Sequence, residues 1–543
     1  MNNAVYNFPL PENEPILDYM KGSPERVLLE NELKRQSRTV LEIPLIIGGK
    51  EITTGNLGEI RMPHDHNKVI ARYHKAGKAE VELAIKAALE ARKSWSDLAW
   101  TIRASILLKA AELLSTRYRS VISAATMLGQ SKNIYQSEID AVCETIDFLK
   151  YNISFTGRIY EQQPKSTFNQ LNKMEYRALE GFVLAVSPFN FTSIASNLNM
   201  APVMMGNTTI WKPASTAILS NYYLMKVFME AGLPAGVINF LPGQGSVIGN
   251  TCLASKDLAG IHFTGSNSTF NGLWTQVSSN LSLYKSYPRL VGETGGKNFV
   301  FVHPSANLND VCINTIRGAF EYQGQKCSAA SRMYVPRSLW PELKKCLGEL
   351  AEEIKMGDVM NPENFMNAVI DEKAFDNIKS YIDYAKRSPD ASIIAGGQCD
   401  KSTGYFIRPT IVETTDPHFK LMQEEIFGPV LCVYVYEDSK LEETLDLCDT
   451  TSPYALTGAV FSTDRVAAAH MCEKLRYAAG NFYINDKPTG AIVGLQPFGG
   501  SRASGTNDKA GGEFNLIRWV NPRTIKETFV SPDDYRYPYM RLT

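Results

Sequence analysis

One cysteine of the chain lies in a segment whose composition suits covalent chemistry. Cys327 is part of YQGQKCSAASR, directly after Lys326 and among small or polar residues. A cysteine attacks carbon as its thiolate, and a neighbouring cation favours that form. Most cysteines are nevertheless small buried hydrophobic residues. The residue type alone therefore leaves two interpretations open, a nucleophile or a packing residue, and its partners must distinguish them.

Two further side chains could assist such a nucleophile. Glu293 lies in VGETGGKN, where glycines let the backbone approach a ligand closely, and its carboxylate could activate a water or the thiol. Asn190 lies in SPFNF, and its amide could donate to a developing oxyanion. Each has a plainer interpretation. Glu293 could be a solvated acid in a turn, and Asn190 a turn residue or a helix N-cap.

The scaffold that would position these side chains is predicted to be α/β. Short apolar runs alternate with helical stretches at about 193–205 and 215–231; the runs are GFVLAVSP, TTIWKP, VINFLPG and GIHFTGS. This alternation predicts a parallel sheet with crossover helices. Ligands bind outside the carboxyl ends of such strands, which draws attention to Asn190, Lys212, Gly243 and Ser266.

Other segments have recognisable patterns of their own. A second αβ series is expected from about 298 to 485, and two amphipathic helices over 79–119. Residues 1–45 are rich in proline and then charged, which predicts an arm laid over the surface. The polar segment 159–178 and the C-terminal WVNPRTIKETFV could form an exposed β-ribbon used in assembly.

Composition narrows the class of protein. The 543 residues are 44% hydrophobic and 21% charged with a net charge of −1, as in ordinary globular proteins. A charge balance near zero gives no electrostatic footprint for nucleic acid or an anionic membrane. There is no run of about 18 apolar residues that would predict a membrane span.

The cysteines and the N-terminus bear on the compartment. Nine scattered cysteines without CxxC or CxxxC pairs argue against a disulfide framework and a structural zinc site, and no metal is expected. They favour a reducing compartment. The N-terminal segment lacks the features of a signal peptide or of a mitochondrial presequence. We therefore expect a cytoplasmic protein, although a mitochondrial matrix protein stripped of its presequence would look the same.

The order of several motifs resembles the aldehyde dehydrogenase superfamily. SPFNF, ETGGK and GQKC occur in the family's order, and FTGS (263–266) and EEIFGPV (424–430) are also typical of it. The resemblance covers roughly residues 45–530. It implies two open parallel-sheet αβ domains, one Rossmann-like and NAD-binding and one catalytic, plus a small β element for homo-oligomerisation.

The resemblance also suggests domain boundaries. They are an N-terminal arm at 1–44, an NAD-binding domain at 45–155 and 175–290, a catalytic domain at 291–485, an oligomerisation element at 156–174 and 518–543, and a substrate-anchor loop with the return to the NAD-binding domain at 486–517.

Catalytic roles follow from the same resemblance. Cys327 would attack an aldehyde to give a thiohemiacetal, whose oxyanion is held by the Asn190 amide and the Cys327 N–H. After hydride transfer to NAD, Glu293 would activate the water that hydrolyses the thioester.

The cofactor's adenosine end is assigned to WKPAST. Lys212 resembles the lysine that meets the adenosine ribose, and Ser215 would lie near the same sugar. Family enzymes that exclude a 2′-phosphate often carry glutamate at this serine position, so NADP stays open beside NAD.

The remaining cofactor residues are assigned to three segments. Ser266 resembles the residue that touches the pyrophosphate at a helix N-terminus, and Gly245 and Gly265 would allow its close approach. Glu425 and Phe427 resemble the pair that holds the nicotinamide ribose and ring.

The segment 482–512 points to a substrate class. It resembles the branch of the family that oxidises glutamate γ-semialdehyde to glutamate, the second step of proline degradation. In that branch the α-carboxylate is held by backbone N–H groups, here those of Gly490 and Ala491, and by a hydroxyl, here that of Ser328. Such donors suit a carboxylate.

Three further residues complete the expected substrate site. Phe191 and Phe498 would sandwich the aliphatic part, and Glu144 would help place the α-amino end, although it could instead be a solvated acid or part of a structural ion pair. The alternatives are a dehydrogenase for another small aldehyde and a non-catalytic protein on the same fold. No nucleic-acid or membrane partner is expected; a homodimer or a higher homo-oligomer is.

Overall fold

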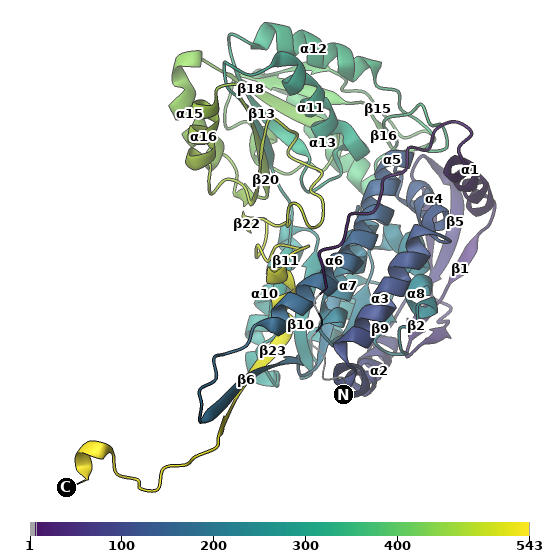
Figure 1. Cartoon of the computed structure of the whole chain (residues 1–543). Helices are drawn as coiled ribbons and strands as arrows, with labels where there is room; N and C mark the ends of the chain where they lie inside the picture. Colours follow the sequence, from purple (N-terminus) through teal and green to yellow (C-terminus); the bar gives the residue numbers. More distant parts are fainter. Residues whose placement is uncertain (1–5, 7, 542–543) are drawn as a thin grey trace.

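The computed structural model describes residue 6 and residues 8–541 and contains two αβ units built on separate sheets (Figure 1). The first sheet has the order β11-β10-β7-β8-β9-β2-β3. Its strands are β2 (Leu45–Ile47), β3 (Lys50–Ile52), β7 (Phe182–Val186), β8 (Thr208–Lys212), β9 (Ile238–Phe240), β10 (Leu258–Thr264) and β11 (Arg289–Glu293). The five strands from β7 to β11 are parallel, as the alternating pattern predicts, whereas β2 and β3 form an antiparallel edge.

Helices cover this sheet and extend beyond it. They are α2 (Lys78–Asp97), α3 (Trp100–Ser115), α4 (Arg119–Gln130), α5 (Ile134–Ser137), α6 (Glu144–Glu161), α7 (Thr192–Met204), α8 (Ile218–Glu230), α9 (Gly245–Leu253) and α10 (Asn267–Ser279). A π-helical turn, Glu138–Cys143, leads into α6. The amphipathic pattern over 79–119 correctly predicts α2 and α3.

The second sheet has the order β14-β17-β18-β13-β12-β20-β21. Its strands are β12 (Asn298–Val302), β13 (Ala330–Pro336), β14 (Ala391–Ala395), β17 (Thr410–Thr414), β18 (Val430–Tyr436), β20 (Thr457–Phe461) and β21 (Asn481–Ile484). Only β14 pairs antiparallel. The helices of this unit are α11 (Leu308–Phe320), α12 (Trp340–Glu353), α13 (Glu372–Arg387), α14 (Lys420–Gln423), α15 (Leu441–Thr450) and α16 (Arg465–Lys474). The predicted α/β class is confirmed.

Smaller elements complete the chain. They are the sheet of β1 (Leu41–Ile43), β5 (Asp65–His74) and β4 (Leu57–Met62), the pairs β15 (Cys399–Asp400) with β16 (Phe406–Ile407) and β19 (Tyr454–Ala455) with β22 (Ser501–Arg502), and the short helix α17 (Glu513–Ile517). No helix in the described chain combines the length and the apolar character that crossing a membrane needs.

The N-terminal arm is more than a surface strap. It contains a helix, α1 (Pro24–Ser37), capped by the Ser23 hydroxyl, and the strand β1. Leu29 and Leu33 of α1 are buried against the helical core. The segment thus also packs into the core through an apolar face that its charged residues conceal in the sequence, and its assignment as a separate arm stays a prediction.

The polar segment and the C-terminal strand do form a ribbon. β6 (Gln170–Ala178) pairs antiparallel with β23 (Val520–Thr528) and projects from the body of the molecule (Figure 1). Three of the expected domain boundaries fall inside elements, since 155/156 cuts α6, 174/175 cuts β6 and 290/291 cuts β11. The sequence shows no break there because each element keeps its pattern through the boundary. The division into domains itself stays a prediction.

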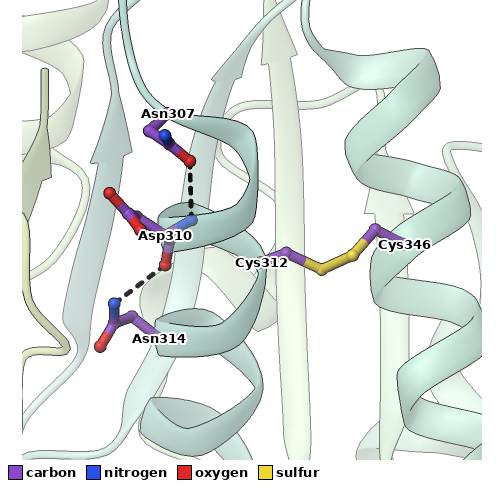
Figure 2. The surroundings of a disulfide bond; sticks show 5 residues. All are labelled: Asn307, Asp310, Cys312, Asn314 and Cys346. Atoms are coloured by element: carbon purple, nitrogen blue, oxygen red, sulfur yellow. Dashed lines mark hydrogen bonds between the residues drawn. A yellow bond between two sulfur atoms is a disulfide. The ribbon is translucent and has the colours of Figure 1, made fainter. Parts of the chain in front are cut away.

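Two cysteines form a disulfide that the spacing did not predict. Cys312 on α11 and Cys346 on α12 are joined, and Figure 2 shows the bond spanning the two neighbouring helices. The scattered spacing of the cysteines argued only against a framework of several disulfides. It could not reveal one pair, 34 residues apart, that meets because α11 packs beside α12.

Candidate active site

One cavity collects most of the residues expected to bind or convert a substrate. It lies between the two αβ units, under the segment that follows β21. The expected residues that line it are Cys327, Glu293, Ser328, Glu144, Phe191, Phe498, Gly490 and Ala491. They come from both sheets, from α6 and from the segment after β21, so folding brings together positions as distant as 144 and 498.

Cys327 is held in a buried loop before β13. A short 3-10 turn, Glu321–Gly324, precedes it, and Gly324 adopts φ +65° where an added Cβ would lie 2.3 Å from the Gly428 carbonyl oxygen. Only glycine fits so close an approach. Cys327 is 7% exposed, and its Sγ lies 3.9 Å from Glu293 Oε1. The nucleophile and the acid expected to serve it are therefore neighbours.

Lys326 does not act as expected. Its ammonium lies 3.4 Å from Glu321 Oε2 and 3.9 Å from Asp140 Oδ2, in a buried cluster. Burial raises the pKa of the Cys327 thiol well above its ordinary value, and the nearby charge of Glu293 adds to this. The expectation that Lys326 stabilises the thiolate is wrong, because two carboxylates bind this ammonium. The N–H groups of Ser328 and Cys327 itself oppose the shift by hydrogen bonding to the sulfur.

Glu293 ends β11 and is only partly exposed. Burial raises the pKa of its carboxyl group to about 8, and hydrogen bonding to Cys327 and the charge of Lys509 oppose that rise. A carboxyl group with this pKa changes protonation state near neutral pH, which suits a general base.

Asn190 follows β7 and is buried beside the catalytic loop. Its Nδ2 donates to the Gln325 carbonyl oxygen at 3.1 Å, two residues before Cys327. An amide in this place can turn toward the oxyanion of the aldehyde once the aldehyde carbon is bonded to Cys327 Sγ. The Cys327 N–H is the second expected donor.

Asn298, at the start of β12, is a positioning residue that the sequence analysis missed. Its Nδ2 donates to the carbonyl oxygens of Cys327 at 2.7 Å and Ala329 at 2.9 Å, and its Oδ1 accepts from Thr457 N–H at 3.1 Å. It thereby fixes the backbone on both sides of Ser328. The only sequence signal was its place directly after the ETGGK segment.

One wall of the cavity carries several hydrogen-bond donors. The Ser328 hydroxyl lies 2.7 Å from the Thr489 hydroxyl, and the chain then turns at Gly490, whose φ is +91°. Within the described chain, the N–H groups of Gly490 and Ala491 donate no hydrogen bond to another residue. Two free N–H groups and a hydroxyl form a suitable site for a carboxylate.

Glu144 lies on the wall of this cavity. Its Oε2 accepts from the Ser193 hydroxyl at 2.5 Å, and burial, reinforced by the charge of Asp140, raises its pKa to about 8. An ammonium group entering the cavity would favour the ionised form of Glu144. Phe191 and Phe498 also line the cavity.

The residues expected to bind the adenosine and pyrophosphate lie outside this cavity, at the carboxyl ends of the first sheet. Lys212 ends β8, Ser215 is exposed just beyond it, Gly245 begins α9, and Ser266 caps α10 by accepting from Thr269 N–H. Gly265 N–H donates to the Glu293 carbonyl oxygen at 3.1 Å. The FTGS loop is thus joined directly to the backbone of Glu293, the residue expected to act as general base.

Glu425 and Phe427, the residues expected to hold the nicotinamide ribose and ring, lie on the second unit and contact the ETGGK and SPFNF segments. Glu425 Oε1 accepts from Gly296 N–H at 2.9 Å, and a Cβ on Gly295 would lie 2.1 Å from its carboxylate. Burial raises the pKa of Glu425 to about 7. The Phe427 ring lies 5.8 Å from that of Phe189, next to Asn190. These contacts bring the EEIFGPV segment to the ETGGK and SPFNF segments.

Comparison with known families agrees with this geometry. The model described as "Aldehyde dehydrogenase family" matches residues 53–525. The chain belongs to the aldehyde dehydrogenase family. The resemblance read from the ordered motifs is therefore confirmed.

Relatives of this aldehyde dehydrogenase include proteins that are about half identical to it over almost their whole length. It is 53% identical over 540 residues to a protein of Dictyostelium discoideum named "Delta-1-pyrroline-5-carboxylate dehydrogenase, mitochondrial", which covers 99% of this chain and 97% of the relative. A Homo sapiens protein of the same name is 50% identical, covering 97% and 94%.

Solved structures of the family superpose closely. The Mycobacterium tuberculosis Delta-pyrroline-5-carboxylate dehydrogenase bound with NAD has a TM-score of 0.96 at 48% identity, with 100% of each chain covered. The 1-pyrroline-5-carboxylate dehydrogenase from Thermus with bound NAD has a TM-score of 0.90 at 32% identity, covering 96% of this aldehyde dehydrogenase and 100% of that chain.

Proposed function

We propose that this aldehyde dehydrogenase oxidises L-glutamate γ-semialdehyde, the open form of Δ1-pyrroline-5-carboxylate, to L-glutamate with NAD, as the second step of proline degradation. The observation that carries the proposal is one cavity lined both by Cys327 and by Gly490 and Ala491, whose N–H groups donate no hydrogen bond to another residue of the described chain. The names of the relatives support the same substrate.

The chain's own residues can carry out the covalent steps. Cys327 Sγ bonds to the aldehyde carbon while its proton passes to the Glu293 carboxylate, 3.9 Å away, and from there to solvent. The C=O electron pair moves to the oxygen, where Asn190 Nδ2 and Cys327 N–H stabilise it. Loss of a hydride leaves a thioester on the sulfur. Glu293 then takes a proton from water, and the water oxygen attacks the thioester carbon. The C–S bond breaks, the product acid leaves, and the thiolate of Cys327 is regenerated on the protein.

The residues of the first sheet fit a dinucleotide. The Lys212 ammonium is partly buried and makes no hydrogen bond or ion pair within the described chain. Its burial lowers its pKa. A buried donor without a partner is costly, and ribose hydroxyls would satisfy it. The helix N-termini at Gly245 and Ser266 suit a pyrophosphate. NAD, when bound, supplies the hydride acceptor. Ser215 adds no carboxylate that would repel the 2′-phosphate of NADP, so steady-state rates with both cofactors measure the preference between them.

A pair of matched aldehydes tests the substrate. 4-Aminobutanal is glutamate γ-semialdehyde without its α-carboxylate, so it loses only the group assigned to Ser328, Gly490 and Ala491. We expect its kcat/KM to be lower by about a hundredfold, because several charge-assisted hydrogen bonds are lost. Steady-state NADH production measures both substrates. Equal kcat/KM values would overturn the proposed anchor and favour a dehydrogenase for another small aldehyde.

We also propose a homo-oligomer assembled through the ribbon of β6 and β23. The ribbon projects from the body, and Phe168 at its tip is 99% exposed. Sedimentation velocity should show a dimer or a larger oligomer, and a chain with Phe168→Ser should dissociate more readily; a wild-type monomer would contradict the proposal.

The word "mitochondrial" in the relatives' names favours a matrix enzyme over the cytoplasmic expectation.

A further inference from the structure

The N-terminal arm forms part of the substrate cavity. Asn13, Glu14 and Ile16 line the cavity that also contains Cys327. In Figure 1 the arm is the dark purple trace that runs along α6 toward α1. The arm therefore reaches the substrate site from more than a hundred residues away in the sequence, and its role is not explained by covering the surface.

Asn13 connects two elements of that site. Its Nδ2 donates to Asp147 Oδ2 on α6 at 2.7 Å and to the Val493 carbonyl oxygen at 2.8 Å, while its Oδ1 accepts from the Tyr151 hydroxyl at 3.1 Å. One amide thus joins α6 to the loop that follows Gly490 and Ala491.

The arm is rigidly held at this point. Glu14 N–H donates to Asp147 Oδ1 at 2.7 Å, and the Glu14 carboxylate pairs with Arg119 at 2.8 Å and Lys150 at 2.9 Å. Arg119 also donates to the Pro15 carbonyl oxygen at 2.7 Å. Because these groups are largely buried, the ion pairs hold the backbone beside Asn13 in one place.

The loop is fixed on both sides of the carboxylate donors, by the buried Thr489 hydroxyl on the Ser328 hydroxyl before them and by Val493 after them. Gly494, with φ +84°, packs so closely on α6 that an added Cβ would lie 2.1 Å from the Tyr151 ring. Val493 is buried, whereas Gly490 and Ile492 are exposed. The position of the two N–H groups therefore depends on Thr489 on one side and, on the other, on the contacts made by Val493 and Gly494 with α6 and the arm.

We propose that Asn13 is a specificity-determining positioning residue: by tying Val493 to α6, it holds the N–H groups of Gly490 and Ala491 where they can bind the carboxylate end of the substrate. The proposal rests on the proposed function, because it assigns that carboxylate to this loop. Small displacements of hydrogen-bond donors are enough to weaken binding of a charged group.

Two variants of Asn13 and one control test this role. Asn13→Ala removes the tie. Asn13→Asp keeps the size of the side chain but replaces the donor with an acceptor facing Asp147 and the Val493 carbonyl. Glu12→Ala changes the exposed neighbouring residue of the same arm. Each full-length protein is compared with wild type in KM and kcat for the semialdehyde and for 4-aminobutanal, in the Kd for glutamate by calorimetry, and in thermal unfolding.

We expect both Asn13 variants to raise KM for the semialdehyde and Kd for glutamate by about tenfold, as for the loss of a buried hydrogen bond. Their kcat/KM for 4-aminobutanal should match wild type, and Glu12→Ala should match wild type throughout. An equal loss for both aldehydes, or unchanged glutamate binding in a folded Asn13 variant, would overturn the proposal. Failure of the proposed function is distinguishable, since wild type itself would then show no preference for the semialdehyde.

Discussion

Cys327→Ala is expected to lower NADH production from glutamate γ-semialdehyde by about 10⁴-fold or more, because no covalent intermediate can form without the nucleophile. The rate is measured by absorbance with both substrates saturating. The side chain is small and buried, so the variant should stay folded, and its unfolding temperature should change little.

Cys399→Ala provides the matched control. Cys399 lies on β15, is half-buried and free, and does not line the cavity. Its replacement should leave turnover within about twofold of wild type, as expected for a site remote from the chemistry. Turnover retained by Cys327→Ala would contradict the covalent mechanism, whatever the behaviour of the control.

Glu293→Gln is expected to separate the two halves of the reaction. Glutamine keeps the size of the side chain but cannot take a proton from water, so thioester hydrolysis should slow by about 10²–10⁴-fold. Rapid mixing should then show a burst of one NADH per active site, followed by slow turnover. A variant that turns over at the wild-type rate without a burst would exclude Glu293 as the base.

The pH dependence of Glu293 has a definite sign. A general base works when deprotonated, and burial raises the pKa of Glu293 to about 8. Where hydrolysis limits the rate, wild-type turnover should therefore rise as pH increases through about 8, and this limb should be lost in Glu293→Gln. The Cys327 thiol, whose pKa is also raised, should instead affect the rate of the burst. A limb near pH 8 that persists in the variant's slow phase would assign it to another group.

The sheets and the residues at the strand ends were predictable from local pattern. Apolar runs of strand length between helical stretches identified β7, β8 and β10, and the side chains that follow them included Asn190, Lys212 and Ser266. Parallel strands place their carboxyl ends at one edge, so these residues had to gather there. The motif order then identified the family.

Long-range side-chain contacts were not predictable in the same way. Asn13 meets Val493 across 480 positions, and the Lys326 ammonium meets the distant Asp140 as well as the nearby Glu321. No local pattern encodes either contact, because both arise only when α6 and its π-helical turn pack against the rest of the chain. Asn298 was missed for a related reason, since its amide acts on a loop about thirty residues further along.

The central claim, that Cys327 becomes acylated by the semialdehyde, is tested most directly by peptide mass mapping. Glu293→Gln is mixed with glutamate γ-semialdehyde and NAD, quenched in acid after the burst, digested and analysed by mass spectrometry. The mechanism predicts a glutamyl thioester on the peptide that contains Cys327, and no such adduct when NAD is omitted. NADH released in the burst with the Cys327 peptide unmodified, or with the acyl group on another residue, would contradict it.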